Sequence, residues 1–269
     1  MAGGRLARLE FEAPDGSSIK RSPSLAVQAH RRLKTLFMLG EMEPGRRLTY
    51  REVADQLGVS VTPAREALFK LVAERIFDLE PSGVISVPDL TAEACGELWR
   101  IRLLLEGHCA EIAAERATPA LIKQMEKAHR LMAEAKQARR LRDGMRHNLA
   151  FHFLLYREAR SPILLALIED IWARSAAYVR FFHSRHVEQR NEAAAQGPHM
   201  HTTIVGALRT GDAARVRNGI ERDLLEVRDG ILNLLKQRED REVQPKAAAP
   251  HTRQRPARPK RIRAQGVGR

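Results

Sequence analysis

The sequence predicts a mainly α-helical protein with an N-terminal winged helix-turn-helix, followed by an antiparallel all-α bundle. Three observations lead to this fold class. Aromatic residues make up only 5% of the 269 residues, whereas Ala, Leu, Arg and Glu are plentiful, and this composition favours helices. Apolar residues recur at helical spacing from about residue 92 to residue 238. Residues 43–87 instead contain two short helical patterns followed by a hairpin pattern.

The first of these short helices has clear start and stop signals. After an expected helix over 24–39, Pro44-Gly45 makes a turn, and Thr49 and Glu52 then have the spacing of a capping box. Gly58 follows the last apolar position, where helices commonly end in a left-handed residue.

The second short helix begins almost at once. Ser60 or Thr62 can cap it, and Pro63 is tolerated in its first turn because no backbone donor is needed there. Two strands, 76–79 and 84–87, then form a hairpin that would be a wing. A helix pair with so short a turn can insert its second helix into a major groove of DNA. The alternative is a small helical subdomain without a ligand, because this geometry also occurs outside DNA binding.

Residues 44–71, PGRRLTYREVADQLGVSVTPAREALFKL, resemble the signature of the GntR family of transcription factors. The resemblance implies a DNA-binding role for the side chains that point outward from the helix pair and the wing. Two of these positions depart from the family pattern: Val61 stands where Arg is most common, and Ser82 stands where the wing tip is often basic. The candidate DNA-contacting residues are Arg51, Ser60, Val61, Thr62, Arg65, Ser82 and Gly83.

The second half of the chain reads as helices joined by short loops. Helix-start signals at Thr91 and Thr118-Pro119, together with apolar stripes, predict six helices, and an antiparallel bundle is the default arrangement for them. The expected helices are 92–116, 119–139, 143–159, 162–186, 197–209 and 212–236. The expected domains are a flexible leader 1–23, the winged helix 24–88, the bundle 89–238 and a disordered basic tail 239–269.

The net charge of +13 is concentrated near the C-terminus. Residues 243–269 carry eight of these charges and no acid, which leaves +5 on residues 1–242. Residues 25–90 contain nine basic and nine acidic side chains. DNA binding by the folded part therefore has to be argued from one face of the molecule and not from total charge. The tail could neutralise DNA phosphates without sequence preference, or it could simply aid solubility.

Four polar side chains in the bundle are candidate ligands. Asn148 and His152 are four residues apart on one helix and so face the same way, while His201 and Asp223 lie on the last two helices. Facing helices can bring such groups together around Zn, Ni or Mn. The alternative is that each histidine is a hydrogen-bonded core or surface residue.

Residues 95–236 resemble the FCD effector domain of the FadR-like branch of the family, in its six-helix, VanR-like size. The resemblance rests on Arg102-x-x-x-Glu106, NLAFH at 148–152, the His201 element and 211–224. In that family one Asp and three His hold a divalent metal beside the effector pocket, which implies a set of Asn148, His152, His201 and Asp223 here. Asn148 replaces the usual Asp and Asp223 replaces the last His, so we expect weaker metal binding. In the metal-free alternative, His152 and His201 bind the effector directly.

Arg102 is a candidate for binding an effector carboxylate, together with Asn148, His152 and His201, because guanidinium suits bidentate pairing. A salt bridge from Arg102 to Glu106, four residues on, is the competing role.

These patterns predict a cytoplasmic transcriptional regulator, most simply a repressor. It would bind a palindromic DNA operator as a homodimer and respond to a small carboxylate effector. No apolar run approaches the length of a membrane span, and the N-terminus has no signal-peptide core. The rival classes are a helical metal-dependent enzyme fused to a DNA-binding module and an architectural DNA-binding protein that senses nothing. Against an enzyme, the sequence has no HExxH motif, nucleophile constellation or Gly-rich phosphate loop.

Overall fold

Three helices and a small sheet make up the N-terminal part of the structure, a computed structural model that describes residues 23–188 and 200–243. The elements are α1 (Leu25–Met38), β1 (Arg47–Leu48), α2 (Tyr50–Leu57), α3 (Val61–Ala73), β2 (Asp78–Leu79) and β3 (Ile85–Ser86). The sheet is antiparallel with the order β1-β3-β2. The two predicted strands are present but shorter than expected, and β1 was missed. Two residues carry too little side-chain pattern to mark a strand, and β1 exists only through its backbone pairing with β3.

The predicted helix signals act through specific bonds. The Thr49 hydroxyl accepts a hydrogen bond from the Glu52 backbone N–H at 3.2 Å, which is one half of the capping box. The Glu52 carboxylate pairs with the Arg46 guanidinium. Gly58 adopts φ 68°, and Ser60 is the N-cap residue of α3. The short turn between α2 and α3 is thus fixed by a left-handed glycine followed by an extended cap.

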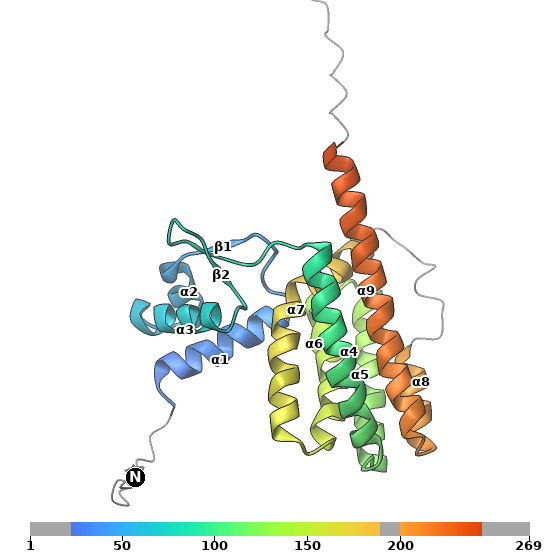
Figure 1. Cartoon of the computed structure of the whole chain (residues 1–269). Helices are drawn as coiled ribbons and strands as arrows, with labels where there is room; N and C mark the ends of the chain where they lie inside the picture. Colours follow the sequence, from blue (N-terminus) through green and yellow to red (C-terminus); the bar gives the residue numbers. More distant parts are fainter. Residues whose placement is uncertain (1–22, 189–199, 244–269) are drawn as a thin grey trace, which may run out of the picture.

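Six long helices form the C-terminal bundle (Figure 1). They are α4 (Ala92–Ala114), α5 (Pro119–Gln137), α6 (Leu141–Glu158), α7 (Pro162–Glu188), α8 (Met200–Arg209) and α9 (Ala213–Val243). Their existence and order match the prediction, and so does the mainly helical fold class. None of the helices that the structure describes has a stretch apolar and long enough to span a bilayer.

The end of α9 is a correction to the prediction. The helix continues to Val243, five residues into the segment expected to be tail. Residues 237–243 contain no Gly or Pro, and helix-compatible charged residues dominate them, so nothing stops the helix before Pro245. Residues 1–22 of the expected leader, 197–199 of the expected fifth bundle helix and 244–269 of the expected tail lie outside the described residues.

The two parts meet where the C-terminal end of α1 reaches α7 (Figure 1). The Lys34 ammonium lies 2.6 Å from the Asp170 carboxylate. The Arg180 guanidinium donates to the Gly40 carbonyl and to the Glu43 carboxylate, the latter at 2.8 Å. These contacts attach the N-terminal part to α7 of the bundle.

Candidate functional site

The outward face of α3 carries the side chains that the sequence singled out. The helix buries one stripe against the core, made of Ala64, Ala67, Leu68 and Leu71. Ser60, Thr62 and Arg65 are exposed, and Val61 is 47% exposed. Arg51 is likewise exposed on α2. These candidate DNA contacts on α2 and α3 are therefore exposed and do not contribute to the core.

The wing is short and held by an ion pair. Ser82 and Gly83 are exposed at its turn, where Gly83 has φ 83°, a conformation that favours glycine. The Arg47 guanidinium donates two 3.1 Å hydrogen bonds to the Glu80 carboxylate, which also accepts one from the Ser82 hydroxyl at 3.3 Å. The Gly83 backbone N–H donates to the Glu80 carbonyl at 2.8 Å, so the wing tip offers the Ser82 hydroxyl and no basic side chain.

In the bundle, Arg102 forms a salt bridge with Glu106 on the same helix, α4. Its Nε donates to Glu106 Oε1 at 2.6 Å, and both side chains are almost completely buried. The guanidinium carbon also lies 4.9 Å and 4.6 Å from the ring centroids of Trp99 and Trp172. Of the two roles that the sequence left open for Arg102, the structure contains the salt bridge. In this conformation its charge is used within the protein.

Glu106 is the centre of a buried hydrogen-bond network that sequence reasoning missed. Its Oε2 accepts from the Tyr156 hydroxyl at 2.6 Å and from Trp172 Nε1 at 2.8 Å. Burial, and next the Glu106 charge, raise the pKa of Tyr156 well above its usual value, so the hydroxyl keeps the proton it donates. Tyr156 could have been suspected, because it lies one turn after His152 on the same helix face.

This network fixes the orientation and tautomer of His152. Its Nδ1 lies 3.2 Å from the Tyr156 oxygen. The single Tyr156 proton already points to Glu106, so His152 must donate from Nδ1 in this contact. In the neutral ring Nε2 is then an acceptor, and Nε2 faces Asp223 Oδ2 at 3.4 Å. An imidazole nitrogen and a carboxylate oxygen placed this way are both good ligands for a divalent cation.

His201 completes the cluster from α8. Its Nε2 lies 3.6 Å from Asp223 Oδ1, and its ring stacks on Phe151 with centroids 3.9 Å apart. One ligand atom from each of His152, His201 and Asp223 lies within 4.8 Å of the others. The structure thus brings together three of the four predicted ligands, one each from α6, α8 and α9.

The donor set suits a divalent metal. Imidazole nitrogen and carboxylate oxygen bind Zn²⁺ at about 2.0–2.2 Å, so ligands of one ion lie about 3–4 Å from one another. The His152–Asp223 and His201–Asp223 distances fall in this range. The Tyr156 contact to His152 is the outer hydrogen bond that metal-bound histidines usually make. These three residues therefore fit a metal with small adjustments of their side chains.

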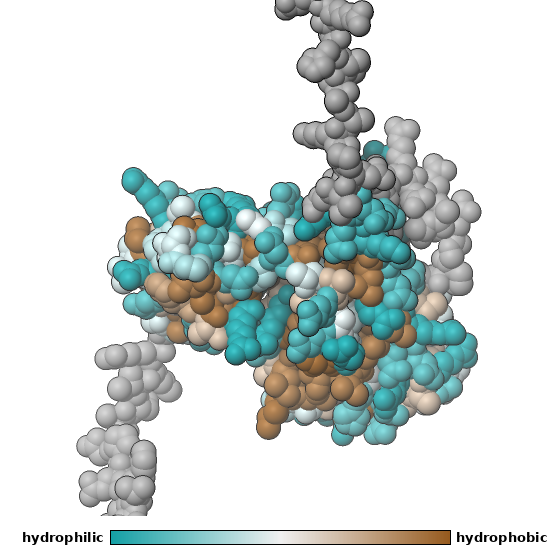
Figure 2. Space-filling model, turned by 45° about the horizontal axis from the view of Figure 1, so that its top comes forward, coloured by the Kyte–Doolittle hydropathy of each residue, from teal (hydrophilic) through white to brown (hydrophobic). Residues whose placement is uncertain are grey.

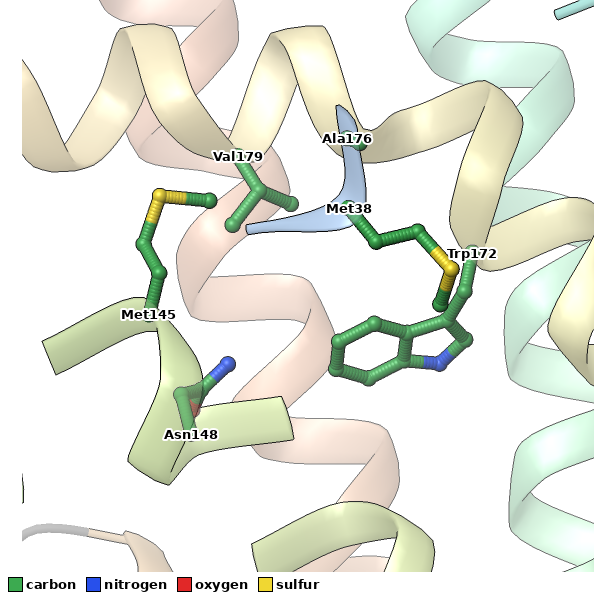
Figure 3. A pocket seen from close by; sticks show the side chains of 6 residues that line it. All are labelled: Met38, Met145, Asn148, Trp172, Ala176 and Val179. Atoms are coloured by element: carbon green, nitrogen blue, oxygen red, sulfur yellow. The ribbon is translucent and has the colours of Figure 1, made fainter. Parts of the chain in front are cut away.

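Asn148, the fourth predicted ligand, lies at the junction of the two parts. With Met38 of α1, it lines a cavity of about 10 Å³, roughly the space of one water molecule. Figure 3 shows the Asn148 amide pointing toward this cavity from one turn before His152. The other lining residues are Met145, Trp172, Ala176 and Val179. Asn148 thus connects the face of α6 that carries His152 to the end of α1.

Two family descriptions match successive parts of the chain. Residues 25–83 match "Bacterial regulatory proteins, gntR family" and residues 97–225 match "FCD domain". The chain is 30% identical over 159 residues to the HTH-type transcriptional regulator McbR of Escherichia coli K12, covering 59% of this chain and 72% of McbR. It is 22% identical over 211 residues to the gluconate operon transcriptional repressor of Bacillus subtilis, covering 78% of this chain and 86% of the repressor.

Solved structures have the same fold. E. coli McbR/YncC superposes with a TM-score of 0.66 at 25% identity, covering 81% of this chain and all of that one. A GntR regulator from Rhodococcus sp. RHA1, described as a putative one, superposes with a TM-score of 0.61 at 22% identity, covering 77% and 97%. The gntR match covers the N-terminal part with α1 to the wing, and the FCD match covers most of the bundle. This chain belongs to the GntR family and is a transcriptional regulator with an FCD domain.

Proposed function

We propose that this protein represses transcription by binding a palindromic DNA operator as a homodimer, and that a small carboxylate effector bound in the bundle controls the affinity. The observation that carries this proposal is the pairing of an exposed α3 face with a His152–His201–Asp223 cluster in the attached bundle. The first suits a major groove, and the second suits a small ligand or a metal. The cytoplasm is the compartment where such a regulator would act.

A second copy of the chain would supply the second recognition helix. α4 and α7 pack together, and each exposes two large apolar side chains. Leu104 is 69% and Ile163 is 77% exposed, and Ile101 and Leu167 accompany them. Hydrophobic surface gathers on the bundle side of the view in Figure 2. Such exposed apolar side chains would suit a subunit interface, and a two-fold dimer through them would present two α3 helices to a palindrome.

The effector would bind at the buried cluster. His152, His201 and Asp223 would hold one divalent ion, with Asn148 as a further and weaker ligand. When bound, a Zn, Ni or Mn ion would supply a Lewis-acidic position for the effector carboxylate. Arg102 contributes to the site indirectly in this scheme, because its charge supports Glu106 and, through Tyr156, His152. Without a metal, the two histidines would bind the carboxylate directly.

The signal would pass from α6 to α1. Asn148 and Met145 of α6 share the small cavity with Met38 of α1. Gly40 is also in tight contact with Met145, since a Cβ built at this glycine would lie 2.4 Å from the Met145 sulfur. A ligand that binds better to one position of α6 would therefore favour one position of the DNA-binding part. A change in the separation of the two α3 helices is enough to weaken operator binding.

Selection of binding sites from random duplex DNA tests the proposal. The wild-type protein is expected to enrich one palindrome, and its Arg65→Glu variant is expected to lose it. Lys123→Glu, an equal change of charge on the exposed face of α5, serves as the matched control and should enrich the same palindrome. Failure to enrich any palindrome would overturn operator binding and favour an architectural role.

The effector is tested on the selected site. Gel shifts and a promoter fusion, with a panel of small carboxylic acids and with and without Zn²⁺, should identify an acid that releases the DNA and raises expression. Chemical turnover of that acid would instead favour the enzyme class. If no acid changes the affinity, the effector part of the proposal is wrong.

A further inference from the structure

Arg65 on the recognition helix lies against two aromatic rings. Its guanidinium carbon is 5.8 Å from the centroid of the Tyr50 ring and 5.5 Å from that of Phe69. The two rings are themselves 6.0 Å apart and inclined by 32°. Tyr50 is the first residue of α2, and Phe69 follows Arg65 by one turn of α3. The three side chains thus form a cluster that spans both helices of the motif.

The charge of Arg65 is not neutralised by an acid. Across residues 23–188 and 200–243, no carboxylate forms a salt bridge with Arg65, whereas Arg46 and Arg47 of the N-terminal part pair with Glu52 and Glu80. Arg65 is also exposed. Cation–π contact uses the flat face of a guanidinium and leaves its edge, which carries the N–H donors, available.

Holding the guanidinium in one place changes what it can recognise. A mobile cation is sufficient for a phosphate, but a planar group fixed in orientation suits a planar pair of acceptors. The guanine edge in the major groove, with O6 and N7, is such a pair. Val61, one turn earlier on α3, has no hydrogen-bonding group and cannot make this pairing, whereas the Arg65 guanidinium can.

We propose that Tyr50 and Phe69 are positioning residues that hold Arg65 for bidentate pairing with one guanine in each operator half-site. This inference rests on the proposed function, because it assumes that α3 enters the major groove. It adds a recognition role for two aromatic residues that would not themselves contact a base. It also assigns Arg65 to base recognition and not to phosphate neutralisation.

Arg65→Gln tests the contact with the base, because Gln pairs with adenine through N6 and N7. Site selection with this variant should change one position in each half-site from G to A. Discrimination at that base pair should fall by about 5- to 100-fold relative to wild type. The opposite outcome is an unchanged selected sequence, a uniform drop in affinity, and a slope of log affinity against log salt that is smaller by about 0.9. Arg65 would then contact a phosphate, and the inference would be wrong.

Phe69→Leu and Tyr50→Leu test the positioning role. Each should keep the overall operator but reduce preference for the Arg65-dependent guanine by about two- to fivefold, the value of an exposed cation–π contact. Tyr50→Phe keeps the ring and is the matched control, with unchanged preference. Circular dichroism and thermal unfolding of each variant report whether the helix pair is intact.

The experiments distinguish a failure of the proposed operator binding from a failure of the positioning role alone. Absence of any operator for the wild-type protein would refute the proposed function. A wild-type operator whose guanine preference is unaffected in both folded leucine variants would refute only the positioning role. Equal losses at every base pair would mean that the rings merely stabilise α2 against α3, which would also overturn the inference.

Discussion

The exposed face of α2 and α3 and the polar centre of the bundle are both built from charged and hydrogen-bonding side chains, but their environments are opposite. On α3, Thr62 and Arg65 are exposed and contribute nothing to the core. In the bundle, Arg102, Glu106 and His152 are each at most 2% exposed. Arg102 pairs with Glu106 directly, and His152 is connected to Glu106 through the Tyr156 hydroxyl. A substitution on the first surface removes one side chain, whereas a substitution in the second disturbs a whole network.

This difference determines how a variant can be interpreted. Loss of DNA binding after a change at Arg65 can be assigned to the interface, since surface changes usually alter stability by less than about 0.5 kcal/mol. Loss of effector response after a change in the bundle cannot be assigned without measuring stability as well. The same residues support the fold and belong to, or adjoin, the proposed ligand site, so a variant there can affect both.

The largest loss of stability is expected from Glu106→Gln, which changes the buried network of the bundle. The change leaves the buried Arg102 charge without its partner and weakens the acceptor of Tyr156 and Trp172. Breaking a buried ion pair on one side costs about 3–5 kcal/mol. Urea unfolding followed by circular dichroism should show a loss of this size.

Glu134→Gln is the matched control for that measurement. Arg130 and Glu134 have the same i,i+4 spacing, but both are more than half exposed, with the nearest nitrogen and oxygen 3.8 Å apart. Such a pair is worth about 0.3–0.5 kcal/mol. Equal losses in the two variants would mean that the Glu106 network is not the structural centre described here.

Metal binding should give the next largest effect. If His152, His201 and Asp223 hold Zn²⁺, a metal concentration of 100 times the dissociation constant should stabilise the protein by about 2.7 kcal/mol. The melting temperature would rise by about 5–10 °C for a protein of this size. Asp223→Asn should abolish most of this rise, and Asn148→Asp should tighten binding, because a carboxylate is a stronger ligand than an amide.

His147→Gln controls for general histidine binding. His147 is adjacent to Asn148 on α6 but is not part of the cluster. The His147→Gln variant should therefore show the same Zn²⁺-dependent stabilisation as the wild-type protein. Absence of stabilisation by Zn²⁺, Ni²⁺ and Mn²⁺ in the wild-type protein would leave the metal-free scheme, in which the two histidines bind the effector directly.

Helix boundaries with local signals could be predicted from the sequence, whereas features that depend on distant residues could not. Caps, turns and apolar stripes are local signals, so Thr49, Gly58 and Pro119 predicted helix boundaries correctly to within a few residues. β1 has no such signal, because it is two residues long and depends on pairing with distant β3. The end of α9 was misplaced because no Gly or Pro marks it.

In the bundle, residue types could be predicted but their connections could not. Spacing and family resemblance suggested His152, His201 and Asp223, which the fold brings together. The Glu106–Tyr156 hydrogen bond joins residues fifty positions apart on different helices. Only the packing of α4 against α6 brings them together, and this packing leaves no periodic pattern in the sequence.

A moderate effect is expected from Val61→Arg, which tests the proposed DNA-contacting surface alone. Val61 can pack against a thymine methyl but cannot pair with guanine. The variant should acquire a G preference at the base pair that residue 61 faces, with a discrimination of about 1–3 kcal/mol. Site selection on both proteins measures it, and thermal unfolding should be nearly unchanged, since the side chain is 47% exposed. Identical selected sequences would show that residue 61 does not face a base.

The smallest effect is expected from Ser82→Lys at the wing tip. A lysine there would reach a phosphate if the wing lies along the DNA backbone, and each phosphate contact adds about 0.9 to the slope of log affinity against log salt. The measurement is fluorescence anisotropy of the operator duplex across a range of KCl concentrations. Lys123 on α5 provides the control site, and Lys123→Ser should leave the slope unchanged because α5 belongs to the bundle and carries none of the candidate DNA contacts. A slope that stays the same in Ser82→Lys would mean that the wing does not approach DNA, and it would restrict the interface to α2 and α3.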